Sequence, residues 1–296
     1  MLKSLQYLPL LLSFGVGVAS AQVAEPPPAF SVEHFEDEVA NHPQDFDPQF
    51  NLGVAYASAG RYEDAVKSLN HAAQLNPQSA KVQNFLGLVH ASLRRFNLSI
   101  IYFEKALGLE PNSVEVRMNL VRSYEHLGLY EEMIEPLRFI VSSQPDDPHY
   151  FSKLGSVYHR LGKFKEAVDP LKKALLLNSG SVEDSKNLGE ALLAEGRYEE
   201  AIHPLKKASL QMPEMAETHY NLGTAYANSN LCKEGARSFA QAIQLSPDFA
   251  EAHANLGWCN EKLGDKNQAI RNYRNALRIK PDLEQVKRNL NLLLEK

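Results

Sequence analysis

The sequence predicts an all-α fold, a solenoid of antiparallel helix hairpins that stack one on another. Two observations predict it. Glycine preceded by leucine recurs at one constant step from Gly53 through Gly87 to Gly257, and Val121 is the one exception. A proline column keeps the same step from Pro77 to Pro281, with one position missing. A fixed period of about 34 residues is typical of repeat folds, in which each unit buries its apolar face against its neighbours.

Each repeated unit is expected to hold two helices, because the recurring columns within it are separated by three, four and seven positions. A residue that tolerates positive φ divides most units and predicts the turn between the helices. The proline column predicts the end of the second helix. The dividing residues are Gly60, Gly128, Gly162, Gly196, Asn230 and Gly264.

The third unit departs from this pattern. Val121, Met133 and Ile140 occupy columns that hold small residues in the other units. Small residues let two helices approach closely, so the larger side chains are expected to spread the two helices of this unit.

The leucine, glycine, tyrosine, alanine and proline columns resemble the tetratricopeptide repeat, without its tryptophan. The resemblance covers about residues 46–283, which it divides into seven repeats. It implies a right-handed superhelix whose first helices line a concave groove, and protein or peptide partners that bind in this groove.

Two flanking segments are expected to cap the array, since the end repeats of a solenoid would otherwise expose their cores. Residues 31–45 are similar to the second helix of a degenerate unit, with Pro43 in phase with the proline column. Residues 284–296 form an amphipathic pattern that predicts a closing helix.

Residues 1–21 differ in composition from the rest. Lys3 precedes an apolar run over 5–18, and Ala19-Ser20-Ala21 follows it, which is the layout of a secretory signal peptide. A membrane anchor is the alternative, but the run is shorter than the roughly 20 residues that span a bilayer. We therefore expect cleavage after Ala21, a proline-rich tether over 22–30, and an exported protein, periplasmic or secreted, that is not inserted stably in the membrane.

Charge and motifs exclude several function classes. The net charge of -5 comes without a basic stripe, which argues against nucleic acid and anionic lipid as partners. The sequence contains no phosphate-binding loop, paired-cysteine metal motif or nucleophile elbow. Repeats and caps occupy the chain beyond the tether, so we expect no enzyme, no cofactor and no metal.

The repeat register supplies candidates for the groove of the resemblance. Apolar or aromatic residues stand at its ends, and histidine and arginine stand at its centre, a pattern that suits an extended peptide with apolar anchors and an acidic or polar middle. An ordinary solvated surface is the alternative, and Tyr220 with Trp258 leaves a glycan-binding module as a second functional hypothesis. The candidates are Phe50, Asn84, Leu88, Arg122, His126, His149, His159, Arg160, Lys186, Tyr220, Asn221 and Trp258.

Cys232 and Cys259 are the only two cysteines. The register places them on adjacent antiparallel helices, almost equally far along the chain from a turn near residue 246, so their sulfurs are expected at similar heights. Two outcomes stay open: a disulfide, which an oxidising compartment would favour, or two buried thiols that pack as small apolar groups.

Overall fold

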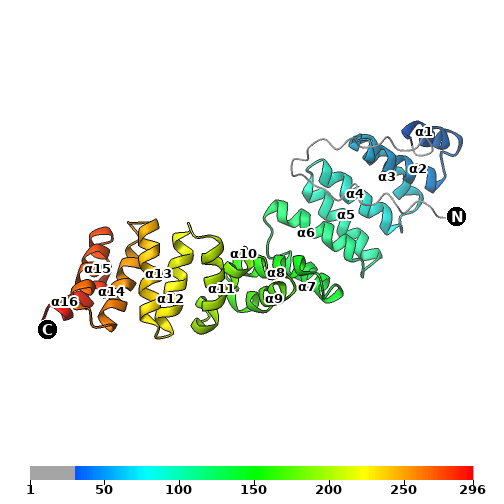
Figure 1. The fold of residues 1–296 in the computed structure, drawn as a ribbon. Coiled ribbons are helices and arrows are strands. Elements are labelled where there is room, and N and C mark those ends of the chain that lie inside the picture. Colours follow the sequence, from blue (N-terminus) through cyan, green and yellow to red (C-terminus); the bar gives the residue numbers. More distant parts are fainter. Residues whose placement is uncertain (1–30, 296) are drawn as a thin grey trace. The chain divides into compact units, whose positions relative to one another are not determined.

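The computed structural model describes residues 31–295, and every regular element in this range is a helix (Figure 1). The all-α fold of stacked helix hairpins is therefore confirmed. The described chain divides into two compact units after Ser143. The expected signal peptide and tether, over 1–30, lie outside the described residues. Among the helices of residues 31–295, none combines the length and apolar character needed to cross a membrane.

The first unit holds a short opening helix followed by three hairpins. In each hairpin we call the even-numbered helix the first helix and the odd-numbered one the second helix. The elements are α1 (Val32–Asn41), α2 (Phe46–Ser58), α3 (Tyr62–Leu75), α4 (Ala80–Ser92), α5 (Phe96–Leu109), α6 (Val114–Leu127) and α7 (Ile134–Ser143).

The second unit holds four hairpins and a closing helix. Its elements are α8 (Pro148–Arg160), α9 (Phe164–Leu177), α10 (Val182–Ala194), α11 (Tyr198–Gln211), α12 (Ala216–Asn228), α13 (Cys232–Leu245), α14 (Ala250–Lys262), α15 (Lys266–Ile279) and α16 (Glu284–Glu295).

A residue with positive φ reverses the chain inside most hairpins. Gly60, with a φ of 75°, is typical, and the next amide, that of Arg61, donates back to the carbonyl of Tyr56 at 2.8 Å. This contact satisfies a carbonyl that the helix end leaves unpaired. Asn230 takes the same place with a φ of 62°, and Arg94 does so with a φ of 58°. The sequence pattern did not include Arg94.

The glycine column marks the point where the two helices of a hairpin cross. A Cβ atom on Gly87 would lie 2.4 Å from Cε1 of Phe103, and one on Gly53 would lie 2.6 Å from Cγ of Leu69. Such distances are far below van der Waals contact, so in these two repeats glycine allows the large side chain of the second helix to reach this depth. Phe103 and Leu69 are fully buried as a result.

The third repeat differs from the others in the structure, although the expected spreading of its two helices stays a prediction. Val121, Met133 and Ile140 are all buried, with at most 2% of their surface exposed. The second helix of this repeat, α7, begins at Ile134, although the repeat register would start it at Tyr130. The disturbance takes the form of a missing first turn, because α7 has 10 residues where α5 and α9 have 14.

The opening helix α1 occupies the place of a second helix. It ends at Asn41, and α3 ends one repeat length later, at Leu75. Ser31 caps its start, with Oγ accepting a hydrogen bond from the amide of His34 at 3.2 Å. The helix therefore covers α2 as a second helix covers the first helix of the following repeat.

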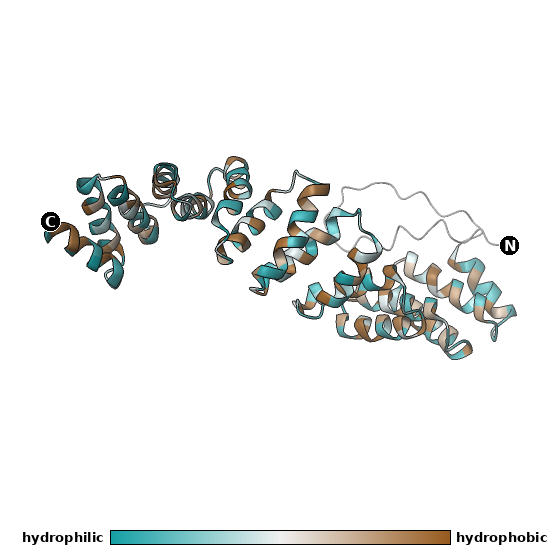
Figure 2. Ribbon diagram, turned by 90° about the horizontal axis from the view of Figure 1, so that it is seen from below, coloured by the Kyte–Doolittle hydropathy of each residue, from teal (hydrophilic) through white to brown (hydrophobic). Residues whose placement is uncertain are grey.

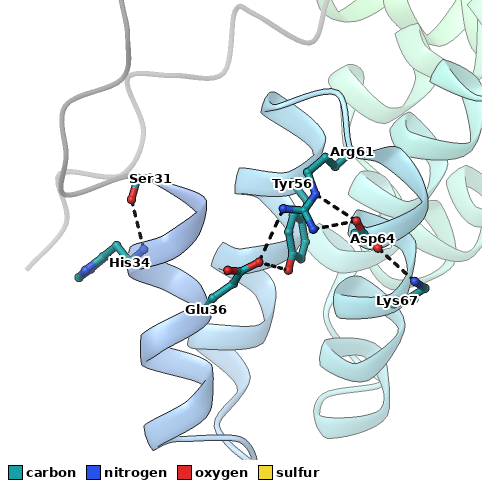
Figure 3. A network of polar contacts seen from close by, with 7 residues as sticks. All are labelled: Ser31, His34, Glu36, Tyr56, Arg61, Asp64 and Lys67. Carbon is teal, nitrogen blue, oxygen red and sulfur yellow. Dashed lines mark hydrogen bonds and ion pairs between the residues drawn. The ribbon is translucent and has the colours of Figure 1, made fainter.

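A polar network joins α1 to the first hairpin (Figure 3). Tyr56 donates its hydroxyl proton to Oε1 of Glu36 at 2.6 Å, and Arg61 lies 4.3 Å from the centre of the Tyr56 ring. Arg61 also lies 3.7 Å from Glu36 and donates to Asp64 at 3.0 Å, and Lys67 reaches Asp64 at 3.0 Å. The network fixes the opening helix at the turn of the hairpin.

The closing helix α16 begins one repeat length after α14 and so has the register of a first helix. Its Val286 and Leu293 are buried in a cluster with Tyr273 of α15. Leu292 and Leu294 are about half exposed, at 57% and 51%. Hydropathy mapped on the ribbon shows hydrophobic and hydrophilic residues alternating along the helices, α16 included (Figure 2).

Candidate functional site

Within each unit the first helices form the inner side of the stack. Helix α4 contacts both α2 and α6 in the first unit, and in the second unit α8, α10, α12 and α14 contact one another in succession. Successive second helices make no comparable contacts in the described chain. In a curved stack, the helices that approach each other most closely lie on the concave side. We call the surface that the first helices of one unit share its first-helix face.

Three candidates on the first-helix face of the first unit lie in its core. Phe50 is 4% exposed, packs edge-on against Phe85 with ring centroids 5.2 Å apart, and has the Lys81 ammonium 4.3 Å above its ring. Leu88 is also 4% exposed and packs in a cluster with Phe103. Both residues stabilise repeat packing, and neither offers an open apolar anchor.

Asn84, the third buried candidate, joins neighbouring repeats. Its Nδ2 donates to Oε1 of Glu115 at 3.0 Å, and its Oδ1 accepts from Nδ2 of Asn119 at 3.2 Å. With 7% of its surface exposed and both ends of its amide engaged, Asn84 holds the repeat interface.

Arg122 and His126 stand one turn apart on α6 of the first unit. The His126 ring is exposed and stacks on Phe96, with centroids 4.4 Å apart and planes 12° from parallel. Arg122 is half-buried, and its Nη1 atom is buried without a hydrogen-bond partner among the described residues. One donor of this guanidinium group is therefore unsatisfied, and the half-buried side chain would have to turn outward to bring it to an added acceptor.

The second unit has a charged cluster on its first-helix face. His159 Nε2 of α8 lies 3.0 Å from Oε2 of Glu190 on α10, at ion-pair distance although the N–H is not aligned as a hydrogen bond. Lys186 Nζ lies 3.7 Å from the same oxygen, and Asn221 Nδ2 of α12 donates to Oε1 at 3.3 Å. Glu190 thus connects three successive repeats.

This cluster determines the charge state of Glu190. Burial raises the pKa of the carboxyl group, but the contact with His159 and the charge of Lys186 outweigh it, so the pKa lies below its usual value. The carboxylate is ionised at neutral pH. Glu190 was not among the sequence-based candidates, because a charged residue on a helix is usually solvated. Only its equal sequence separation from His159 and Asn221 could have indicated the pairing.

The remaining candidates of the second unit occupy different positions. His149, the second residue of α8, is exposed and lies edge-on to Tyr150 with centroids 5.1 Å apart. Arg160 is exposed at the last position of α8. Lys186 also lies 3.5 Å from Glu183. Arg122 and His126 belong to the first unit and the other histidine and arginine candidates to the second, and the expected centre of histidine and arginine stays a prediction.

Tyr220 and Trp258 are both engaged in packing. The Tyr220 ring lies against Phe249 with centroids 4.7 Å apart, and its hydroxyl accepts a hydrogen bond from Asn255 at 3.3 Å. Trp258 is half-buried in the clusters on both sides of α14, and Lys262 stands 5.5 Å from its ring centre. Both aromatic side chains are therefore partly buried by packing.

The two cysteines lie together as separate thiols. Cys232 and Cys259 are both buried and share a cluster with Phe239. Burial, and then a hydrogen bond to Cys232, raises the pKa of the Cys259 thiol far above its usual value. The disulfide stays a prediction. Within residues 31–295, no three side chains of His, Cys, Asp or Glu gather to form a metal site.

Four family models match the chain, and all describe the tetratricopeptide repeat. They match residues 31–80 and 50–113, 148–180, 189–230, and 250–283. The matched segments together cover more than half of the 296 residues. The chain belongs to the tetratricopeptide repeat family, and the family and the array of repeats make it a scaffold for protein interaction.

Solved structures support the same fold. MamA residues 41-end from Desulfovibrio magneticus RS-1 matches with a TM-score of 0.50 and 23% identity over 57% of this chain and 96% of MamA. MamA AMB-1 matches with a TM-score of 0.50 and 25% identity over 57% of this chain and 92% of its own. The comparison with curated proteins gave no match.

Proposed function

We propose that this scaffold binds an extended protein segment along the first-helix face of its first unit, and that Arg122 recognises an acidic side chain of that segment. The observation that carries the proposal is the buried Nη1 of Arg122, which lacks a hydrogen-bond partner among the described residues. His126 stands one turn further along α6 and extends the same surface.

The energetic argument concerns an unpaired donor. A buried polar group without a partner costs about 1–3 kcal/mol, and more when it is charged. A carboxylate that accepts from the guanidinium group recovers this cost and adds a charge-assisted hydrogen bond, which is short and about twice as strong as a neutral one. Among the candidates, the cation at Arg122 therefore has the most to gain from a ligand, because Lys186 and His159 already face Glu190.

Peptide display on the full chain tests this proposal. Peptides selected from a random library are expected to carry an enriched acidic position, and their affinities can be measured by fluorescence anisotropy. Arg122→Gln is expected to weaken binding about 10-fold or more, the value of one charge-assisted hydrogen bond. Arg237→Gln, on the second helix α13, is the matched control and should leave affinity unchanged. Equal affinity of wild type and Arg122→Gln would refute the assignment.

A glycan-binding function has less support. Stacking on sugars requires open aromatic faces, and the rings of Tyr220 and Trp258 pack inside their repeats. We also propose a non-catalytic role, since the charged clusters described above consist of pairs that join repeats.

We propose further that the scaffold acts outside the cytoplasm. Residues 1–21 support this, through the lysine, apolar run and Ala-Ser-Ala sequence of a secretory signal. Amino-terminal sequencing of the protein from fractionated cells tests it. A mature chain that starts at Gln22 in an exported fraction is the expected result, and an intact amino terminus in the cytoplasmic fraction would contradict it.

A further inference from the structure

The repeats can be compared with one another at the register position that starts the second helix, which in the third repeat precedes α7. An aromatic residue stands there in the first five repeats, and a cysteine stands there in the sixth. The column reads Tyr62, Phe96, Tyr130, Phe164, Tyr198 and Cys232. A second column, at a constant separation further along the chain, lies on the next first helix. It reads Val89, Ser123, Val157, Ala191, Ala225 and Cys259.

These two columns meet at repeat interfaces. Tyr62 packs in the same cluster as Val89, and Phe164 packs in the same cluster as Ala191. At these two interfaces an aromatic ring of one repeat and a small or branched residue of the next thus share one hydrophobic cluster. At the interface of α13 and α14, both members of the contact are replaced by cysteine, and the chain has no other cysteine.

Replacing the aromatic ring by cysteine weakens the packing of this interface if the two cysteines serve only as buried apolar side chains. An aromatic side chain contributes a large buried area to such an interface, and a thiol in its place gives most of that area up. At the facing position, cysteine in place of alanine adds little buried area. A covalent cross-link between the two sulfurs would offset this loss.

The local geometry suits a cross-link. Cys232 is 9% exposed and Cys259 is 0% exposed, and both lie in one cluster with Ala227 and Phe239. Burial, and then the neighbouring Cys232, raises the pKa of the Cys259 thiol. Cys232 is also the first residue of α13, at the turn of the hairpin.

We propose that Cys232 and Cys259 are a redox-active pair that an organic disulfide oxidises to a cross-link between α13 and α14. The Cys232 thiolate attacks one sulfur of the organic disulfide and releases one reduced thiol, which leaves a mixed disulfide on Cys232. Cys259 then loses its proton to solvent base, attacks the Cys232 sulfur and releases the second reduced thiol. Two protein thiols are oxidised, and one organic disulfide is reduced to two thiols.

The order of attack follows from exposure and acidity. Cys232 is the more exposed sulfur, and burial holds the pKa of Cys259 high, so Cys259 is the poorer nucleophile and acts second. The cross-link closes the loop of chain between Cys232 and Cys259, which restricts the unfolded chain and so favours the folded one. Oxidation would therefore stiffen this repeat interface.

Oxidation of the folded full chain by oxidised glutathione tests the proposal. The reduced protein is incubated at a pH of about 8.5, near the ordinary thiol pKa. It is then alkylated in denaturant and mapped by peptide mass spectrometry. We expect one linked pair of peptides that contain Cys232 and Cys259, a rise in Tm of roughly 5–10 °C, and reversal of both by dithiothreitol.

Two variants separate the steps. Cys259→Ser is expected to stop at a mixed disulfide on Cys232, and Cys232→Ser is expected to keep an unmodified Cys259. Free thiols in the wild type after incubation, while the same chain oxidises in denaturant, would overturn the proposal. So would a stable mixed disulfide on wild-type Cys232 that never resolves into the linked pair.

Discussion

The hydroxyl group of Tyr56 donates a hydrogen bond to Glu36 at 2.6 Å, across 20 positions of sequence. Tyr124 and Glu104 repeat this contact at 3.2 Å with the same separation. The opening helix α1 therefore presents to α2 a residue that α5 presents to α6. A helix of 10 residues thus reproduces a specific contact of the internal repeats.

Removal of this hydroxyl should loosen the opening helix. Tyr56→Phe is expected to cost about 0.5–1.5 kcal/mol in urea unfolding and to speed hydrogen exchange in α1. The bond to Glu36 raises the pKa of Tyr56. The contribution of this hydrogen bond to stability is therefore complete below the ordinary tyrosine pKa of about 10. It is lost as pH rises through the pKa of Tyr56 in the folded protein. Tyr62→Phe, which keeps a ring that packs against an apolar cluster, serves as control and should cost less than half as much.

Close helix crossing makes Gly87 and Gly108 respond oppositely to the same substitution. Gly87→Ala places a Cβ atom 2.4 Å from the Phe103 ring and should destabilise the fold by about 1–3 kcal/mol. Gly108→Ala meets no atom within 4 Å on α5 and should stabilise the helix by about 0.5–1 kcal/mol. Urea unfolding of both variants checks this. Changes of the same sign in the free energy of unfolding would show that the two helices do not cross closely at Gly87.

Periodicity predicted the fold almost completely, because each column has one packing role. The glycine column fixes the crossings, as at Gly53 and Leu69. The late start of α7 was beyond prediction, since the sequence shows that Val121 is too large but not which turn is lost. The positive φ at Arg94 could not be predicted from the sequence either, because arginine does not favour that conformation.

The burial of the candidate residues was predicted less well than the fold. The register shows which side of a first helix faces inward, but not how closely neighbouring first helices approach. Helix α4 is covered by α2 and α6, so Phe50 and Leu88 lie in the core. Glu190 belongs to the charged cluster through its tertiary contact with His159, which no local sequence pattern indicates.

The turn at Arg94 stores strain that glycine would remove. Arg94 has a φ of 58°, where a Cβ atom costs about 1 kcal/mol. Arg94→Gly is therefore expected to stabilise the chain by about 0.5–1 kcal/mol in urea unfolding. The reverse change at the equivalent turn, Gly60→Ala at a φ of 75°, should cost a similar amount although no atom lies within 4 Å. Stabilisation by Gly60→Ala would contradict the account.

Glu190 should give the second unit a pH-dependent stability. Glu190→Gln leaves Lys186 and His159 without their carboxylate and is expected to cost about 1–2 kcal/mol at a pH of about 7. The folded pKa of Glu190 is depressed, so its contribution is present above the unfolded value of about 4.3 and is lost as pH falls through the folded value. Urea unfolding should therefore show the stabilities of wild type and variant converging as the pH falls through the depressed pKa of Glu190.

Glu183→Gln supplies the matched control for this prediction. Glu183 is 64% exposed and lies 3.5 Å from Lys186, so solvent screens the pair and the change should cost less than about 0.5 kcal/mol at any pH. If the two variants lost equal stability, the contacts of Glu190 across three repeats would add nothing to an ordinary surface charge. A larger loss of stability for Glu190→Gln that disappears at acidic pH would instead show that one carboxylate stabilises the packing of α8, α10 and α12.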